Sequence, residues 1–282
     1  MKRLVRKYLL LESVLAFSAI VSLTAVLDKP ETARASSITQ ASSGTGCDLF
    51  TYTSICLEDN FPNGIPAAPG TFVMGSLGWA CSSGGAGLCQ LTANETNWDG
   101  GYHLNTIVGA GSDAILFLRN GTEAANEAWN NLATLSSWKI DWLFRTPDGS
   151  ATGATYRMGL RSTLISDVFT VRWIQGTDTN WTIERRNGGG AITTTCAGSE
   201  APSATNYYIF EITGAGSTTL TTHLFKSTAN YAGAQTGTDI LSACTATIST
   251  PTYGFVPIYQ VIAAGSDPVS LNIHGFRAKF TF

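Results

Sequence analysis

The chain has 282 residues, of which only 13% are charged, and its 17 Lys and Arg stand against 20 Asp and Glu. Residues 1–35 hold six of the basic residues and three of the acidic ones. Residues 36–282 therefore have 11 Lys and Arg against 17 Asp and Glu, a formal charge of −6. A mildly acidic chain lacks the clustered Lys and Arg on which sequence-independent nucleic-acid binding and attraction to anionic lipid depend. Neither partner is expected.

The N-terminus has the order of parts of a secretory signal peptide. Four basic residues lie within the first seven positions, residues 13–27 are uncharged and largely apolar, and Ala33-Arg34-Ala35 offers small residues for cleavage after Ala35. A membrane anchor is the alternative, but residues 13–27 fall short of the roughly 20 that a spanning helix needs. No later segment reaches that length. We therefore expect a secreted or cell-surface protein with no membrane span after processing.

The cysteines indicate disulfides. An even number of cysteines in an exported chain favours pairing, although six allow 15 connectivities. The simplest connectivity joins sequence neighbours: Cys47–Cys56, Cys81–Cys89 and Cys196–Cys244. Zinc is the alternative, but no pair has CxxC spacing and the three histidines lie far apart in the sequence.

The chain divides into three parts: the signal peptide at 1–35, a Ser/Thr-rich N-terminal segment at 36–57, and one large domain at 58–282. Within the domain, residues 81–89, "CSSGGAGLC", are expected to form a glycine loop closed at its base by cysteines. Only residues 123–135 are predicted to form a short helix, because their apolar residues recur at helical spacing.

The rest of the domain predicts strands, because short runs of alternating apolar residues are separated by Gly, Asp and Asn. The expected strands are 113–119, 138–145, 155–162, 168–175, 180–186, 207–213, 221–227, 253–263 and 270–282. Many short strands with little helix are typical of an all-β protein built as an antiparallel sandwich or barrel.

Period-two counting assigns a face to each side chain of the strands at 138–145 and 155–162. The core face should hold Trp138, Ile140, Trp142, Phe144, Tyr156, Met158 and Leu160. The opposite face should form one solvated cross-strand charge ladder of Arg145, Arg157, Arg161 and Arg172 with Asp141 and Glu184. Such a ladder could also serve as a ligand surface for acidic sugars.

Taken in order, the segments 58–87, 106–121, 138–160, 178–195 and the C-terminal strands resemble the concanavalin A-like jelly-roll domains. These occur in phage virion and tail-associated proteins and in bacterial exported proteins. The shared features are an opening Asp-Phe segment (Asp59 and Phe61), a Gly-Trp soon after it (Gly78-Trp79), and an Asn-Trp after a tight turn (Asn180-Trp181). The resemblance implies a jelly-roll β-sandwich and is weak for activity. The signal peptide and the cysteines point to an exported relative.

Two tryptophans in loops are candidate ligand contacts. Trp98 lies among turn residues with Asp99 and Tyr102 nearby, and Trp181 follows the turn that contains Asp178. An indole ring can stack on the C–H face of a sugar while carboxylates bind its hydroxyls. The alternative for Trp181 is that it only covers the end of the core. Calcium could be held by Asp99, Asp148 or Asp178, but no Asp-x-Asp-x-Asp loop is present, so no metal or other cofactor is expected.

No catalytic residue is assigned. A glycosidase of this fold would need two converging carboxylates, and no compact acidic motif places them on one face of a strand. We expect a non-catalytic binding or adhesion module that recognises a glycan or cell-surface polysaccharide. A structural subunit of a surface layer, filament or virion-like assembly, with homo-oligomer contacts, is the alternative, and a glycan-cleaving enzyme is the third hypothesis.

Overall fold

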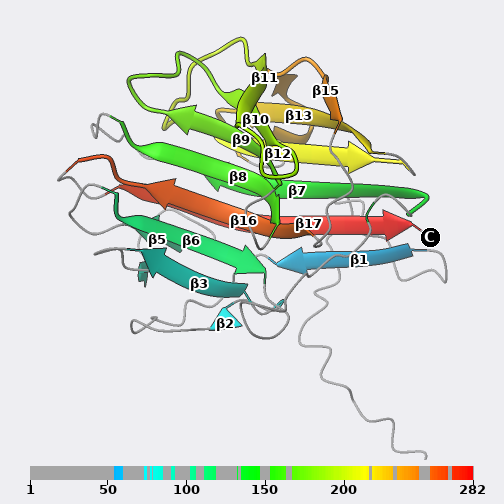
Figure 1. Ribbon diagram of the computed structural model, residues 1–282, viewed down its shortest axis with the longest axis horizontal. Helices are drawn as coiled ribbons and strands as arrows, with labels where there is room; N and C mark the ends of the chain where they lie inside the picture. Colours follow the sequence, from blue (N-terminus) through cyan, green and yellow to red (C-terminus); the bar gives the residue numbers. More distant parts are fainter. Residues whose placement is uncertain are drawn as a thin grey trace, which may run out of the picture. The chain divides into compact units, whose positions relative to one another are not determined.

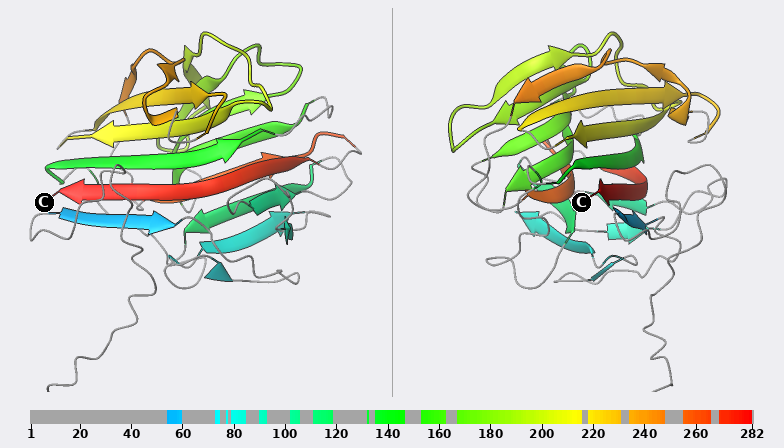
Figure 2. Two further views of the ribbon diagram at one scale, coloured as in Figure 1. Left: turned by 180° about the vertical axis from the view of Figure 1, so that it is seen from behind. Right: turned by 90° about the vertical axis from the view of Figure 1, so that its right-hand side faces the viewer.

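Two antiparallel sheets stack face to face and enclose the core (Figure 1, Figure 2). The structure, a computed structural model, describes residues 54–59, 73–74, 77, 79–84, 90–92, 102–105, 111–118, 132, 135–146, 153–162, 167–215, 218–230, 234–247, 255–265 and 269–281. Both sheets belong to the unit formed by Ala41–Phe282. No helix of these residues is long and apolar enough to cross a membrane.

The first sheet, called sheet A here, has the strand order β14-β13-β12-β7-β17-β5-β4, with β1 also paired to β17 and β15 to β13. Its strands are β1 (Ser54–Asp59), β4 (Gln90–Thr92), β5 (Tyr102–Asn105), β7 (Ser137–Arg145), β12 (Tyr207–Gly214), β13 (Thr219–Ser227), β14 (Thr238–Asp239), β15 (Cys244–Thr247) and β17 (Ser270–Thr281). Seen from behind, β1 and β7 flank β17 (Figure 2).

The second sheet, called sheet B here, has the order β11-β10-β9-β8-β16-β6-β3-β2. Its strands are β2 (Val73–Met74), β3 (Trp79–Gly84), β6 (Asp113–Leu118), β8 (Thr155–Ser162), β9 (Val168–Ile174), β10 (Thr182–Arg186), β11 (Thr193–Ala197) and β16 (Phe255–Ile262). All nine strands predicted from the sequence are present, and the fold is the expected all-β jelly-roll sandwich.

The core lies between the sheets and consists mainly of aromatic and branched side chains. The seven residues assigned to the core face, Trp138, Ile140, Trp142, Phe144, Tyr156, Met158 and Leu160, are all buried. The prediction of which face is buried is therefore confirmed. Aromatic rings from both sheets meet edge to face, as in the contact of Trp79 on β3 with Phe276 on β17 at a centroid distance of 5.0 Å.

Two strand edges are joined covalently. A disulfide links Cys196 on β11, at the edge of sheet B, to Cys244 on β15 of sheet A. Arg185 Nη1 on β10 also donates a hydrogen bond to the Thr247 carbonyl oxygen on β15 at 2.8 Å. The predicted pair Cys196–Cys244 is thus confirmed, whereas Cys47 and Cys89, and with them the other two predicted pairs, lie outside the described residues.

Two expectations were wrong. Residues 81–84 do not begin a glycine loop but continue β3, which pairs with β6. β1 starts at Ser54, inside the segment expected to precede the domain, because its backbone pairs with β17 from Ser54 to Asp59. The predicted helix at 123–135 lies outside the described residues except for Leu132 and Leu135.

Candidate functional site

The outer face of sheet A carries polar side chains in ordered rows across its central strands. In one row, Thr221, Thr213, Lys139 and Lys279 follow one another on β13, β12, β7 and β17 as direct cross-strand partners. Ser137 and Thr281 are partners in the neighbouring row, toward the end of the sheet. Because alternate residues of a strand share a face, this pattern places hydroxyls and ammonium groups together on one surface.

These rows line an open groove of about 590 Å³. Its lining residues are Ser137, Trp138, Lys139, Thr213, Gly214, Ala215, Thr219, Thr221, Lys279 and Thr281. The indole of Trp138 lies directly against Gly214, since a Cβ added at Gly214 would be 2.4 Å from Trp138 Cε2. Only glycine leaves room for that ring. We refer to this feature as the hydroxyl–lysine groove.

A second row on the same face is charged and largely covered. It runs from Arg277 on β17 through Asp141 on β7 and Glu211 on β12 to His223 on β13. Arg277 Nη2 lies 3.0 Å from Asp141 Oδ2, and the Lys139 ammonium is paired with Glu211. Lys139 Nζ is also 3.8 Å from Asp141 Oδ1. The charged row therefore borders the hydroxyl–lysine groove, and Lys139 of the groove forms an ion pair with Glu211 of that row.

Asp141 is only 5% exposed, and this burial has the largest effect on the pKa of its carboxyl group. Loss of hydration raises the pKa of Asp141 to about 6, and the nearby Glu211 carboxylate adds to that rise, although Arg277 and Lys139 act in the opposite direction. With its amide oxygen turned toward the guanidinium, Gln235 accepts a hydrogen bond from Arg277 Nη1 at 2.6 Å. The segment that contains Gln235 thus helps to hold the Arg277 side of the ion pair.

Glu211 is a site residue that the sequence analysis missed, and it brings a second carboxylate next to Asp141. No local pattern could have shown it, because β12 and β7 become neighbours only in the sheet. A glycosidase pair needs an acid and a nucleophile or base that face a cleft with room for substrate and water. Here Arg277 binds one carboxylate and Lys139 the other, so the arrangement is that of an ion-paired network.

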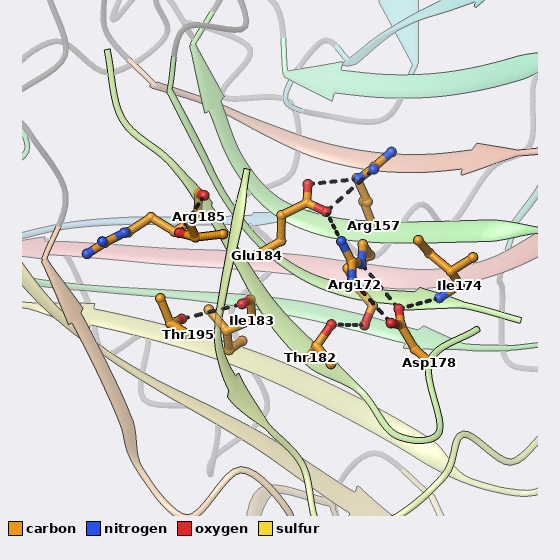
Figure 3. Close-up of polar contacts among 10 residues, drawn as sticks. Arg157, Arg172, Ile174, Asp178, Thr182, Ile183, Glu184, Arg185 and Thr195 are labelled. Carbon is orange, nitrogen blue, oxygen red and sulfur yellow. Dashed lines mark hydrogen bonds and ion pairs between the residues drawn. The ribbon is translucent and has the colours of Figure 1, made fainter. Parts of the chain in front are cut away.

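A separate ionic network covers the outer face of sheet B (Figure 3). Glu184 on β10 accepts hydrogen bonds from Arg157 Nε on β8 and from Arg172 Nη1 on β9, both at 3.0 Å. Arg172 also donates two bonds to Asp178, from Nε at 3.2 Å and from Nη2 at 3.1 Å. The Glu184 side chain is 1% exposed, so its charge depends on these two guanidinium groups.

The prediction of one solvated charge ladder is therefore wrong. Asp141 and Arg145 lie on sheet A, whereas Glu184 and the other arginines lie on sheet B. Asp141 and Glu184 are buried rather than solvated. Arg145 makes different contacts, because its Nη2 donates to the Ala204 carbonyl at 2.6 Å and its guanidinium lies over the Tyr207 ring.

Replacing Glu184 with glutamine should lower the free energy of unfolding by about 2–3 kcal/mol, because a buried group that pairs with two cations becomes neutral. Chemical denaturation of both proteins at pH 7 measures the difference. Glu200, on the surface and paired with Lys226, is the control: its change to glutamine should cost less than about 1 kcal/mol. Equal losses in the two variants would contradict the role assigned to Glu184.

The turn before β10 accounts for two of the predicted ligand contacts. The Asp178 carboxylate accepts the Ile174 backbone N–H at 2.8 Å in addition to the Arg172 bonds, so it holds the turn together. Trp181 is 0% exposed and packs edge to face against Phe144 and Tyr208. Its ring is not available at the surface, which agrees with the alternative that it covers the end of the core.

The described part of the structure does not place the remaining predicted ligand contacts at this turn. Trp98 and Asp99 lie outside the described residues, and Tyr102 is placed only by its backbone, in β5 opposite Ile273. For calcium, Asp99 and Asp148 are likewise outside, and Asp178 is engaged by Arg172. Within the described part of the chain, no three His, Cys, Asp or Glu residues gather as metal ligands would.

No protein-family model matches the sequence, and no curated protein matches it significantly. Solved structures share the fold. A protein of unknown function from Shewanella oneidensis MR-1 is similar at a TM-score of 0.53 and 14% identity, over 81% of this chain and 87% of that one. Lectin I from Ulex europaeus, solved with the methyl glycoside of α-L-fucose, has a TM-score of 0.51 at 15% identity, over 81% of this chain and 98% of the lectin chain. Peanut lectin has a TM-score of 0.50 at 9% identity, over 81% of this chain and 97% of the lectin chain. The chain therefore has the concanavalin A-like lectin fold.

Proposed function

We propose that this protein is an extracellular, non-catalytic glycan-binding module and that the hydroxyl–lysine groove holds the ligand. The observation that carries this proposal is the groove itself, which has the volume of a small-ligand site and a lining rich in hydroxyl groups. The threonine hydroxyls lie close to the backbone of paired strands, so the sheet holds them in place and they lose little freedom when they bind sugar hydroxyls.

Three further features support the proposal. The fold is that of lectins, although fold alone does not assign a ligand. The basic and then apolar N-terminus favours export, and the Cys196–Cys244 disulfide is the kind of bond that persists in an oxidising compartment. We retain Trp98, Asp99 and Tyr102 as further proposed ligand contacts.

The test is a glycan array followed by titration of the best ligand. Changing Thr213 and Thr221 together to valine keeps side-chain shape and strand propensity but removes two hydroxyls, so we expect binding to weaken about tenfold. Thr194 on β11 is exposed and lies in the other sheet, so its change to valine is the matched control. Trp98→Ala tests the loop contact in the same assay. Unchanged binding by the double variant would exclude the groove as the site.

A structural subunit is the second candidate, and one observation favours it. β11 ends sheet B, its residues Thr193–Ala197 are mostly exposed, and none is charged. An edge strand without charge is suited to pairing with another chain. Light scattering of the purified protein distinguishes the two candidates: a mass that corresponds to an assembly, together with no glycan binding, would favour the subunit.

A further inference from the structure

The hydroxyl–lysine groove presents positive rather than negative charge to a ligand. Lys139 and Lys279 are direct cross-strand partners on β7 and β17, and both residues are exposed. The groove lining contains no aspartate or glutamate. Lys139 is already paired with Glu211, and an anionic group in the groove would reach both ammonium groups from the solvent side.

Asp141 and Glu211, two carboxylates of the described part of this face, are covered more fully than the lysine beside them. The Asp141 and Glu211 side chains are 7% and 13% exposed, whereas the Lys139 side chain is 49% exposed. Asp141 is paired with Arg277 inside the covered row, where both side chains are less than a tenth exposed. A ligand that enters the groove therefore meets ammonium groups and hydroxyls first, and screening by water is incomplete beside the covered row.

We propose that the preferred ligand is an acidic saccharide, one that carries a carboxylate or sulfate group. The anion binds at Lys139 and Lys279, while Thr213 and Thr221 in the same row receive the hydroxyls of the sugar ring. This inference rests on the proposed function and specifies its ligand class. A charge-assisted hydrogen bond is stronger than a neutral one, so the acidic group distinguishes this ligand from neutral glycans of the same shape.

The experiment compares matched ligands that differ only in charge. A glycan array carries uronic-acid glycans beside their methyl esters and sulfated glycans beside their desulfated forms, and the purified protein is applied at low and high salt. We expect the acidic member of a pair to bind roughly tenfold more tightly. Raising the NaCl concentration should weaken the binding of the acidic glycan and leave the binding of the neutral glycan unchanged.

Lys279→Gln keeps the length of the polar side chain and removes its charge. It should abolish the preference for the acidic member without affecting the neutral member, and Lys279→Arg should restore the preference. The control is Lys226→Gln, which makes the same change of net charge on β13 outside the groove lining and should retain the preference. The melting temperature of each variant shows that it is folded.

Each outcome separates this inference from the function on which it rests. Acidic preference that is lost in Lys279→Gln and kept in Lys226→Gln supports the inference. Equal binding of acidic and neutral members overturns the acidic ligand but leaves a glycan-binding module. Binding to neither member overturns both.

Discussion

Replacing Arg277 with methionine should lower the free energy of unfolding by about 3–5 kcal/mol at pH 7.5, because the buried Asp141 carboxylate loses its closest cation. The effect depends on pH. The pKa of Asp141 is raised to about 6 from 3.8, so the favourable contribution of its bound proton is fully present below 3.8 and is lost as the pH rises through 6. At pH 5 the loss caused by Arg277→Met should therefore be smaller. Urea denaturation at both pH values measures it.

Two further variants decide the cause of that loss. Asp141→Asn combined with Arg277→Met removes both charges, and we expect it to recover at least half of the stability lost by Arg277→Met alone. Lys279→Met, on the same strand but exposed, should change stability by less than about 0.5 kcal/mol. If the double variant is no more stable than Arg277→Met, the loss comes from packing of the arginine side chain instead of from an unpaired charge.

Changing Cys196 and Cys244 together to serine should lower the free energy of unfolding by up to about 4 kcal/mol, the value that chain entropy assigns to a loop of this length. The bond joins positions 48 residues apart and connects the edge of sheet B to sheet A. Thermal and urea unfolding under oxidising conditions measure the difference. The effect acts mainly on the unfolded chain, so the folded variant should keep its circular dichroism spectrum.

Reduction of the unmodified protein is not an equivalent experiment, because a reductant acts on any disulfide of the chain at the same time. The control is Cys196→Ser/Cys244→Ser treated with dithiothreitol, which reports the contribution of any disulfide other than Cys196–Cys244. If the variant and the unmodified protein unfold at the same urea concentration before reduction, the bond does not stabilise the fold.

The strands were predictable because their signal is local. Alternation of apolar and polar residues in β7 and β8 follows from the strand period alone, and burial of Trp142 and Tyr156 confirmed it. β3 was missed because "CSSGG" has no apolar alternation. It is a strand because its backbone pairs with β6, and the hydrogen bonds of that pairing do not depend on side-chain type.

The environment of the charged residues could be predicted only in part from the sequence. Period-two counting correctly placed Asp141, Arg157 and Glu184 on faces that point away from the core. It could not show that Asp141 and Glu184 lie in different sheets, and it assumed that a face outside the core is solvated. Exposure depends on which strands and segments lie alongside, and these come from distant parts of the chain.

The amino-acid sequence by itself determined the fold class and the core face of the long strands. Both follow from residue type and spacing along a short stretch. The cysteine count favoured disulfides but left 15 connectivities open, and the structure joins Cys196 to Cys244. The tertiary structure alone decided that Arg277 binds Asp141, that Lys139 binds Glu211, and that β7, β12, β13 and β17 together form the hydroxyl–lysine groove. The reason is that cross-strand neighbours are set by the order of strands in a sheet, which the spacing of residues within one strand does not encode.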